Sequence, residues 1–476
     1  MTITHSGEAL LVSIFAAHGS SPRVAGIMTQ HVNKHLLARL SSDYGILGVL
    51  VLLCAYFSWA TLQEQHPTGE AAAKAAAKTV FRSLSKTSKL MIVTKTVAHD
   101  NEFAVALDSL FKVAGYKTSA VLQGDPAEVR QALQALADSG IVLDAIVTTH
   151  DYAHAVQNLV MRFPALAATK VFIAESYRWP TFLLRENLIN VLNQIAVIAI
   201  MAIGMTMVIV TGGIDLSVGS VVALAAVVAT RLIVSWGGTE ASAATMIAAA
   251  MLAIVACGVL GAACGFFITR FNLPPFIATL AWMLVASGLA YIIAGGESIY
   301  DLPNSFVWLG RGADLFAIPN AVVLMFLLYL LANFVMGHTV FGRHIYAVGG
   351  NVEAARFSGI SIKKNLLWVY TISGAMAGLG GIILASQLKS GAPTYGVMYE
   401  LYVIAAVVVG GASLSGGEGK IFGTLIGALI IAVIQNGMNL TGVESYTQKV
   451  VLGLVILGAV LLDKLRRMGK LFNRRS

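Results

Sequence analysis

Asp215 is the only acidic residue in a long apolar stretch of this chain. It lies in the segment Thr211-Gly-Gly-Ile-Asp-Leu-Ser-Val-Gly-Ser220, between two apolar runs with almost no polar loop. A carboxylate at membrane depth tends to face a pathway or a partner, because its charge is costly in lipid. The side chains of Asp215, Ser217 and Ser220 could also cap the following helix. The two roles are compatible, and the sequence leaves both open.

The segment Leu414-Ser-Gly-Gly-Glu-Gly-Lys420 has the composition of a nucleotide-binding loop. It is similar to the signature segment of ABC ATPases and, more loosely, to a P-loop. Leu414 stands where a P-loop has its first glycine, and Ile421 stands where it has Ser or Thr. Because no complete Walker A motif occurs in the sequence, we predict that the chain is not itself an ATPase, and we interpret 412–420 as a glycine-rich turn on the inner side. No paired acid and base, Ser-His-Asp set or metal-ligand spacing occurs, so we expect no enzyme activity, cofactor or metal.

A basic stretch at 341–364 predicts one short helix lying on a membrane surface. Asn351 is a suitable N-cap, and Gly359 can take the left-handed conformation that ends a helix. Glu353 in the first turn and Arg356 in the last turn each suit their end of the helix dipole. A capped helix of about two turns is not stable alone in water, so it should dock on something. The alternative is an ordinary basic loop that obeys the positive-inside rule.

The composition shows what must position these residues. The chain is 57% hydrophobic and 12% charged, with a mean hydropathy of +0.77. Several uncharged runs approach the roughly twenty residues that cross a bilayer as helix. We predict an α-helical polytopic membrane protein with about ten transmembrane helices and an inserted small α/β parallel-sheet lobe. The predicted spans are 45–62, 190–211, 216–236, 244–269, 275–296, 315–337, 366–386, 400–414, 421–439 and 450–463.

Basic residues in the short loops orient these spans. If the N-terminus is inside and the spans alternate, most basic loop residues fall inside: Arg270, Arg343, Arg356, Lys363, Lys364, Lys420, Lys464, Arg466, Arg467, Lys470, Arg474 and Arg475. The short outside loops hold only Arg311, Lys389 and Lys449. We therefore expect both termini in the cytosol. The net charge of +8 is small for 476 residues, and no motif indicates nucleic-acid binding.

Small residues indicate where helices pack closely. Glycines four residues apart occur at 261 and 265, at 374 and 378, and at 423 and 427. Such pairs let helix backbones approach in lipid, although glycine is also generally common in membrane helices. The three cysteines, Cys54, Cys257 and Cys264, fall within apolar spans, where we interpret them as packing residues.

One polar region, 63–180, interrupts the membrane pattern and falls outside in this topology. Residues 63–86 are predicted as a helical linker, because 70–78 has the repeat of a semi-rigid helical spacer. Residues 87–176 alternate strand and helix patterns, with strands at 89–95, 117–123, 142–148 and 170–174. This alternation predicts a small parallel sheet with right-handed crossovers.

Polar residues follow the strands of this lobe. Asp100 and Asn101 come after the first strand, and Asp151 and Glu175 come after later strands. Ligands bind open parallel sheets at this edge. The alternative is that Asp100 and Asp151 simply cap helices.

The ends of the chain carry less information. We expect 1–44 to be a cytosolic segment and 469–476 to be a basic cytosolic tail. Met28 is an alternative start, and the sequence does not decide between Met1 and Met28.

Residues 181–468 resemble the ribose-type sugar permeases of bacterial ABC importers. The resemblance rests on several motifs in order, namely 186–193 (Glu-Asn-Leu-Ile-Asn-Val-Leu-Asn), 211–220, 346–356 (Tyr-Ala-Val-Gly-Gly-Asn-Val-Glu-Ala-Ala-Arg), 399–411 and 423–429. It implies a permease homodimer in the inner membrane that is surrounded by lipid. The implied partners are two cytosolic ATPase subunits and a periplasmic sugar-binding protein.

The resemblance also implies roles for particular residues. The ATPase contact would be formed by Gly342, Arg343, Gly350, Asn351, Glu353, Ala354, Arg356 and Gly359. The translocation pathway would include Asn193, Asp215, Ser217 and Ser220.

The lobe is a departure from the pattern of this family, whose typical members have only a short connection between the first two spans. Residues 87–176 resemble the first part of the N-terminal lobe of sugar-binding proteins, through 89–95, 100–103, 144–149 and 171–176. This adds Phe103 to Asp100, Asn101, Asp151 and Glu175 as residues for a ligand or a docking partner. The family's usual Pro is Glu102 here, and the second lobe of the clamp is missing, so we expect docking and not sugar capture.

We therefore expect the permease subunit of an ATP-driven importer for a monosaccharide, pentose-like, with 63–180 in the periplasm. One alternative is a membrane sensor or docking protein for a sugar or a sugar-binding protein, and another is an ATP-independent carrier. The identity of the sugar and the role of the lobe are not determined by the sequence.

Overall fold

The structure, a computed structural model, describes residues 45–472 without the side chains at 462, 463 and 465–472. These residues form two compact units, of which unit 2 is Trp59–Leu183 and unit 1 is the remainder. The predictions on 1–44 and Met28, and those on the side chains of the tail 469–476, lie outside the described residues.

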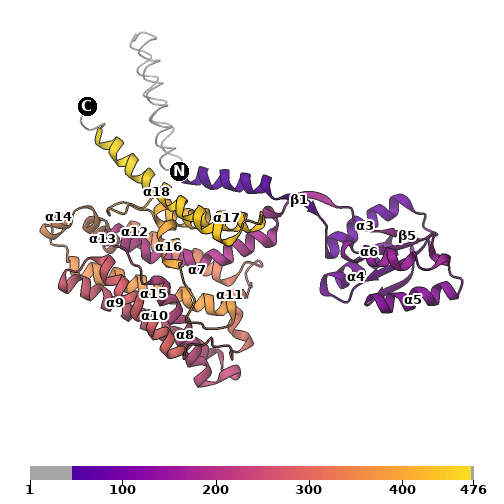
Figure 1. The fold of residues 1–476 in the computed structure, drawn as a ribbon, viewed down its shortest axis with the longest axis horizontal. Helices are drawn as coiled ribbons and strands as arrows, with labels where there is room; N and C mark the ends of the chain where they lie inside the picture. The colour runs from indigo at the N-terminus through magenta and orange to yellow at the C-terminus, as the bar shows by residue number, and fades with distance from the viewer. Residues whose placement is uncertain (1–44, 473–476) are drawn as a thin grey trace, which may run out of the picture. The chain divides into compact units, whose positions relative to one another are not determined.

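Unit 1 consists of helices (Figure 1). Seven described helices are long and apolar enough to cross a membrane: α7 (Arg185–Val210), α8 (Val218–Trp236), α9 (Ala243–Phe271), α10 (Pro275–Ala294), α12 (Asn320–His338), α15 (Ile362–Leu388) and α17 (Ile421–Leu440). Three apolar helices are shorter: Gly45–Ala60, α16 (Tyr399–Val409), and Ser445–Leu461 within α18 (Ser445–Phe472). Each predicted span overlaps one of these helices, but ten membrane crossings stay a prediction.

The connecting segments of unit 1 hold short helices: η3 (Gly238–Glu240), η4 (Asn304–Val307), α11 (Trp308–Arg311), α13 (Val340–Gly350) and α14 (Val352–Phe357). α7 lies at the centre, where α15, α17, α16 and α12 pack around it. Every residue of α7 from Ile195 to Val210 is buried, as expected for a helix that is apolar on all sides. In contrast, α9, α10 and α12 expose many large apolar side chains, which is the pattern of a lipid-facing surface.

The paired glycines lie at close helix contacts, as predicted. A Cβ at Gly261 on α9 would lie 3.3 Å from the Cα of Gly374 on α15. A Cβ at Gly427 on α17 would lie 2.7 Å from the Gly410 nitrogen at the end of α16. Larger side chains at these positions would push the helices apart.

Unit 2 contains a four-stranded parallel sheet in the order β3-β2-β4-β5. Its strands, β2 (Lys89–Thr94), β3 (Lys117–Gln123), β4 (Ala145–Thr148) and β5 (Lys170–Phe172), lie within the predicted ranges. One face packs against α3 (Gly69–Ser83) and α4 (Ala98–Ala114), and the other against α5 (Pro126–Asp138) and α6 (His150–Val160). β1 (Leu62–Gln65) and β6 (Tyr177–Pro180) form an antiparallel ribbon that joins the two ends of the unit. The unit also holds two 3₁₀ turns: η1 (Pro164–Leu166) precedes β5, and η2 (Thr181–Leu183) follows β6.

The packing of α3 differs from the predicted linker. The segment is helical, as expected, but its apolar residues are buried in the core with α4 and the sheet: Ala72, Ala73, Ala76, Ala77 and Val80. Alanines at this spacing form a smooth stripe that suits either a spacer or a close helix contact. Whether the helix is a spacer or part of a core depends on whether another element packs against the stripe, and in this structure α4 does so.

Candidate functional site

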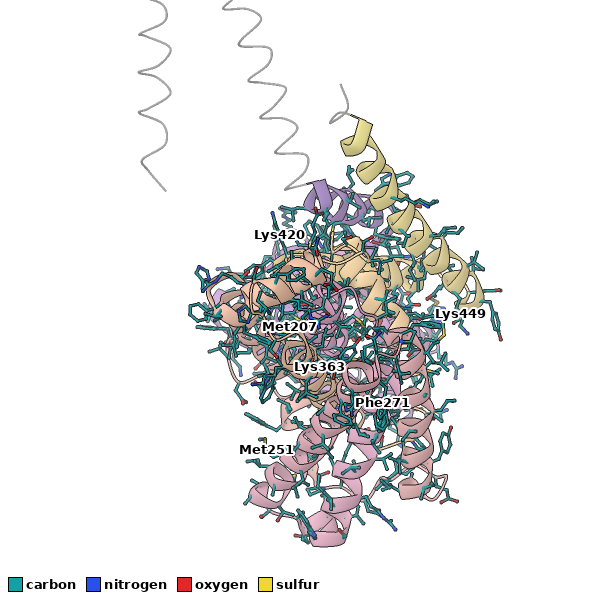
Figure 2. All side chains as sticks on the ribbon, turned by 90° about the vertical axis from the view of Figure 1, so that its left-hand side faces the viewer. Met207, Met251, Phe271, Lys363, Lys420 and Lys449 are labelled. Atoms are coloured by element: carbon teal, nitrogen blue, oxygen red, sulfur yellow. The ribbon has the colours of Figure 1, made fainter. Side chains whose placement is uncertain are left out.

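The stretch 341–364 holds two short helices, α13 and α14, where a single one was predicted. Thr339 caps α13, because its hydroxyl accepts from the Gly342 N–H at 3.2 Å. The overlooked signal is this threonine, which stands three residues before the helical N–H that it binds. Figure 2 views unit 1 from the side that carries α14 in Figure 1, with Lys363 and Lys420 labelled.

α14 is capped as predicted. Asn351 Oδ1 accepts from the Ala354 N–H at 2.9 Å, and Gly359 follows the helix with a φ of +80°. Glu353 lies in the first turn and Arg356 in the last turn, and both are exposed. The cap, the helix end and the charge arrangement are therefore confirmed.

α14 also presents an aromatic side chain that the sequence reasoning missed. Phe357 is 87% exposed and Val352 is 47% exposed, whereas Ala355 between them is buried. Exposed apolar side chains beside charged ones are typical of a surface that another protein covers. The available signal was a phenylalanine at the last position of a short, capped surface helix.

The glycines around α13 have different surroundings. Gly350 is exposed, and a Cβ there would meet nothing within 4 Å. Gly342 is buried, and a Cβ there would lie 2.6 Å from the Cα of Met336. Gly342 therefore lets α13 turn closely against α12 and does not itself form part of an exposed contact. Arg343, the next residue, is exposed.

Behind the exposed helices, α13 contacts the end of α7 and the glycine-rich turn. A Cβ at Gly349 would overlap the carbonyl oxygen of Val210, the last residue of α7, and would lie 2.6 Å from the Gly417 nitrogen. The Gly417 N–H donates to the Val210 carbonyl at 2.8 Å. Gly416 and Gly417 both have positive φ, which confirms the predicted turn at 412–420. We call these contacts the α7–α13 junction.

Tyr346 adds a side-chain bond to the α7–α13 junction. Its hydroxyl donates to the Gly419 carbonyl at 2.6 Å. Burial of the ring raises the pKa of Tyr346, so the hydroxyl keeps the proton that it donates.

Asp215 lies in the break between α7 and α8 and is 2% exposed. Its Oδ1 accepts from the Ser217 N–H at 3.0 Å and from the Ser217 hydroxyl at 2.6 Å. Its Oδ2 accepts from the Ser373 hydroxyl on α15 at 2.8 Å. Both carboxylate oxygens are therefore engaged by hydrogen bonds, which offset part of the cost of burying the group.

The predicted capping role is altered in detail. Ser217 is the N-cap residue of α8, but its side chain makes no cap bond. Asp215 instead binds the backbone N–H of Ser217, while Ser220 is half-buried on α8. Ser373 lies 158 positions from Asp215 in the sequence, so the residues around Asp215 gave no indication of this hydrogen bond.

Asn193 lies near the opposite end of α7 from Asp215. The distance along the helix from Asn193 to Val210 is about 25 Å. The Asn193 side chain donates to the Gly310 carbonyl at 3.0 Å, and Gln387 donates to the Asn193 backbone carbonyl at 2.8 Å. The predicted pathway residues therefore fall into two separate groups, with Asn193 on α7 and Asp215, Ser217 and Ser220 at the break before α8 and in its first turn.

In unit 2, Asp100 is 3% exposed and serves its own chain. Its Oδ2 accepts from the Lys95 N–H at 3.0 Å and from the Thr149 hydroxyl at 3.3 Å. It does not cap α4, whose N-cap is Val97. Its carboxylate therefore ties the end of β2 to the start of α6.

The remaining predicted lobe residues differ in burial. Phe103 is completely buried in the core, so its place among surface contacts is wrong. It is one of the apolar positions that hold α4 against the sheet. Asp151 and Glu175 are exposed, and Asn101 has a buried Oδ1 without a partner among the described residues. Among the parts of the chain that the structure describes, no cluster of His, Cys, Asp or Glu could hold a metal ion.

A family of transport proteins matches the chain over 187–460. The family is described as "Branched-chain amino acid transport system / permease component". The chain belongs to this family. The matched range covers α7, the α7–α13 junction, α14 and the Asp215 break, and it lies within unit 1. The permease is thus a multi-pass membrane protein and not an enzyme.

Curated relatives include several sugar permeases. The permease is 44% identical to the ribose import permease protein RbsC of Escherichia coli (strain K12) over 64% of this chain and 94% of the relative. It is 44% identical to the protein of the same name from Bacillus subtilis, over 63% and 92%. It is 39% identical to the galactose/methyl galactoside import permease protein MglC of Salmonella typhimurium, over 60% and 89%. The chain matches no solved structure.

Proposed function

We propose that this permease is the membrane-spanning subunit of an ATP-driven importer that carries a pentose-like monosaccharide across the bacterial inner membrane. The observation that carries the proposal is the 44% identity to ribose import permeases of two bacteria over 92% or more of their length. The family match over 187–460 supports the transport role independently of any one relative.

The proposed assembly is a homodimer of ten-span subunits with both termini in the cytosol. Two cytosolic ATPase subunits would supply energy, and a periplasmic sugar-binding protein would deliver the sugar. Residues 63–180 would lie in the periplasm, and the exposed apolar sides of α9, α10 and α12 would contact lipid.

α14 is the proposed contact with the ATPase. Its exposed Phe357 supplies an apolar anchor, and Glu353 and Arg356 supply charges on the same short helix. A movement of α14 would pass through α13 to the end of α7, because the α7–α13 junction has no space to absorb it. The break that holds Asp215 follows directly after that end of α7.

The pathway proposal places Asp215, Ser217 and Ser220 at the inner part of a route along α7 and α8. Asn193 would lie at its outer part. Since Asp215 is bound by serines from two helices, a shift of α15 against α8 would free one of its oxygens. Unit 2 is proposed as a docking module for a soluble partner, through exposed residues such as Asp151 and Glu175.

Transport can be tested in proteoliposomes that contain the permease, its ATPase and the binding protein. We expect ATP-dependent uptake of labelled ribose, with competition from unlabelled pentoses stronger than from hexoses. Absence of ATP-dependent uptake for every monosaccharide tested would refute the proposed function.

The ATPase contact can be tested with two exposed phenylalanines. Phe357→Ala should weaken co-purification of the ATPase about tenfold or more, because a central aromatic anchor typically dominates an interface. Phe316→Ala is the matched control, since Phe316 is 84% exposed and lies in the connection between α11 and α12. The double change Glu353→Ala and Arg356→Ala should likewise lower sugar-stimulated ATP hydrolysis. Equal ATPase recovery with both phenylalanine variants would remove α14 from the coupling role.

A further inference from the structure

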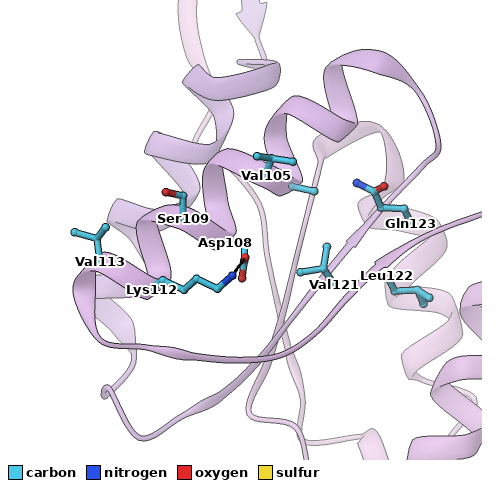
Figure 3. A pocket seen from close by; sticks show the side chains of 9 residues that line it. Val105, Asp108, Ser109, Lys112, Val113, Val121, Leu122 and Gln123 are labelled. Atoms are coloured by element: carbon cyan, nitrogen blue, oxygen red, sulfur yellow. Dashed lines mark ion pairs between the residues drawn. The ribbon is translucent and has the colours of Figure 1, made fainter.

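One side of unit 2 exposes an apolar surface that the proposed transport cycle does not use. Val105 and Val113 on α4 are 71% and 86% exposed, and Val121 on the neighbouring strand β3 is 44% exposed. These residues border a groove of about 840 Å³ (Figure 3). β3 is an edge strand, so its outer backbone groups face no other strand within the described part of the chain.

The exposed side of α4 is self-complementary. Ser109 is exposed and lies midway between Val105 and Val113, which are four residues before and four residues after it. Asp108 and Lys112 flank the same line and form an ion pair of 2.6 Å within the helix. Residues four apart on a helix share one face, so the whole group forms a single stripe.

A two-fold axis through Ser109 would match this stripe with itself. In an antiparallel pair of α4 helices, Val105 of each copy would lie opposite Val113 of the other. Asp108 of each copy would lie within one turn of Lys112 of the other, so both charges would meet an opposite charge. Such reciprocity is the property of an isologous interface, and the small side chain of Ser109 permits close approach at its centre.

We propose that unit 2 is a self-association module whose α4–β3 surface binds the same surface of a second copy of this chain. Features of β3 favour a closed pair over open-ended strand addition. The strand begins with Lys117, and its register to β2 shifts between Thr118 and Ala120. A lysine and a bulge are devices that limit pairing at a sheet edge, so the helix stripe carries the contact. The proposal goes beyond the proposed function, which supplies no role for pairing between lobes.

Cysteine crosslinking on the full-length permease in membranes tests the proposal. Ser109→Cys should form a covalent dimer with a short bis-methanethiosulfonate reagent. Ser139→Cys is the matched control, because Ser139 is also exposed but lies at the end of α5 on the other face of the sheet. The unaltered chain gives the background from Cys54, Cys257 and Cys264, of which the last two are buried.

A charge exchange then tests the orientation. In the Ser109→Cys background, Asp108→Lys should lower the crosslinked fraction about tenfold, since two symmetric attractions become repulsions. Adding Lys112→Asp should restore the crosslinked fraction, because positions 108 and 112 of the two copies again carry opposite charges. Limited proteolysis of the same membranes, with the cleavage pattern of the unaltered chain, shows that the single variant has not unfolded.

Two results would overturn the proposal. One is crosslinking at position 109 that is no higher than at position 139. The other is protection of the Ser109→Cys thiol from a bulky maleimide without any self-crosslink, which would assign the surface to a different protein. Sugar uptake measured on the same membranes separates this outcome from a failure of the transport proposal, because uptake tests transport and the crosslink tests the surface.

Discussion

Replacing Gly349 with alanine is the sharpest test of the packing behind α14. The new Cβ would overlap the Val210 carbonyl oxygen and approach the Gly417 nitrogen to 2.6 Å. α7, α13 and the glycine-rich turn must then separate. Gly350, the next residue, provides a matched control, because a Cβ there meets nothing within 4 Å.

The expected cost has two parts. Overpacking of a close contact costs about 1–3 kcal/mol. Separation of the segments also stretches the 2.8 Å bond from the Gly417 N–H to the Val210 carbonyl, and a buried bond left unmade costs about 1–3 kcal/mol. The higher helix propensity of alanine returns up to about 1 kcal/mol in either variant. Gly349→Ala should therefore be destabilising by about 1–5 kcal/mol, and Gly350→Ala should be neutral or slightly stabilising.

The assay is thermal unfolding of the detergent-solubilised permease, followed by the fraction that stays unaggregated after heating. Gly349→Ala should lower the midpoint by about 1–7 °C, and Gly350→Ala should leave it unchanged or raise it slightly. Midpoints that agree for the two variants would show that α7 and α13 are not in contact, and the coupling route proposed through this junction would then be wrong.

Three further outcomes follow from buried contacts. Ala76→Leu should destabilise unit 2 by about 1–3 kcal/mol and speed its proteolysis in the full chain. Ala71→Leu, on the exposed side of α3, should have neither effect. Equal rates of proteolysis for the two variants would favour the spacer interpretation of α3. Asp215→Ala should abolish uptake and lower the unfolding midpoint, because it leaves the buried hydroxyls of Ser217 and Ser373 unpaired. Asp215→Asn should keep most of the stability. An unchanged midpoint for Asp215→Ala would contradict these hydrogen bonds. Tyr346→Phe should cost about 0.5–1.5 kcal/mol through the lost bond to Gly419, and thermal unfolding without any shift would argue against that bond.

Local features were predictable from the sequence because their causes are local. Asn351 caps α14 and Gly359 ends it through backbone groups within a few residues. The apolar runs predicted helices at all ten positions, and the strands of unit 2 followed from runs such as 89–95. Glycine spacing predicted the close contact of Gly261 with α15, because few other residues permit that approach in lipid.

Other features depended on which surfaces meet. The alanine stripe of α3 was compatible with a spacer and with a core helix, and only the presence of α4 selected the core. Phe103 matched a ligand-site motif in sequence, yet its direction on α4 buries it completely. Phe357 was an unremarked apolar residue until the fold left it 87% exposed.

The sequence by itself therefore determined the class of the protein, its apolar helical segments, the cap of α14 and its resemblance to sugar permeases, since composition and short-range spacing carry that information. The tertiary structure alone decided that Asp215 accepts a hydrogen bond from Ser373, that Gly349 meets the end of α7, and that the α4–β3 surface is uncovered. These contacts join segments far apart in the chain, and their partners are selected by shape after the helices have formed.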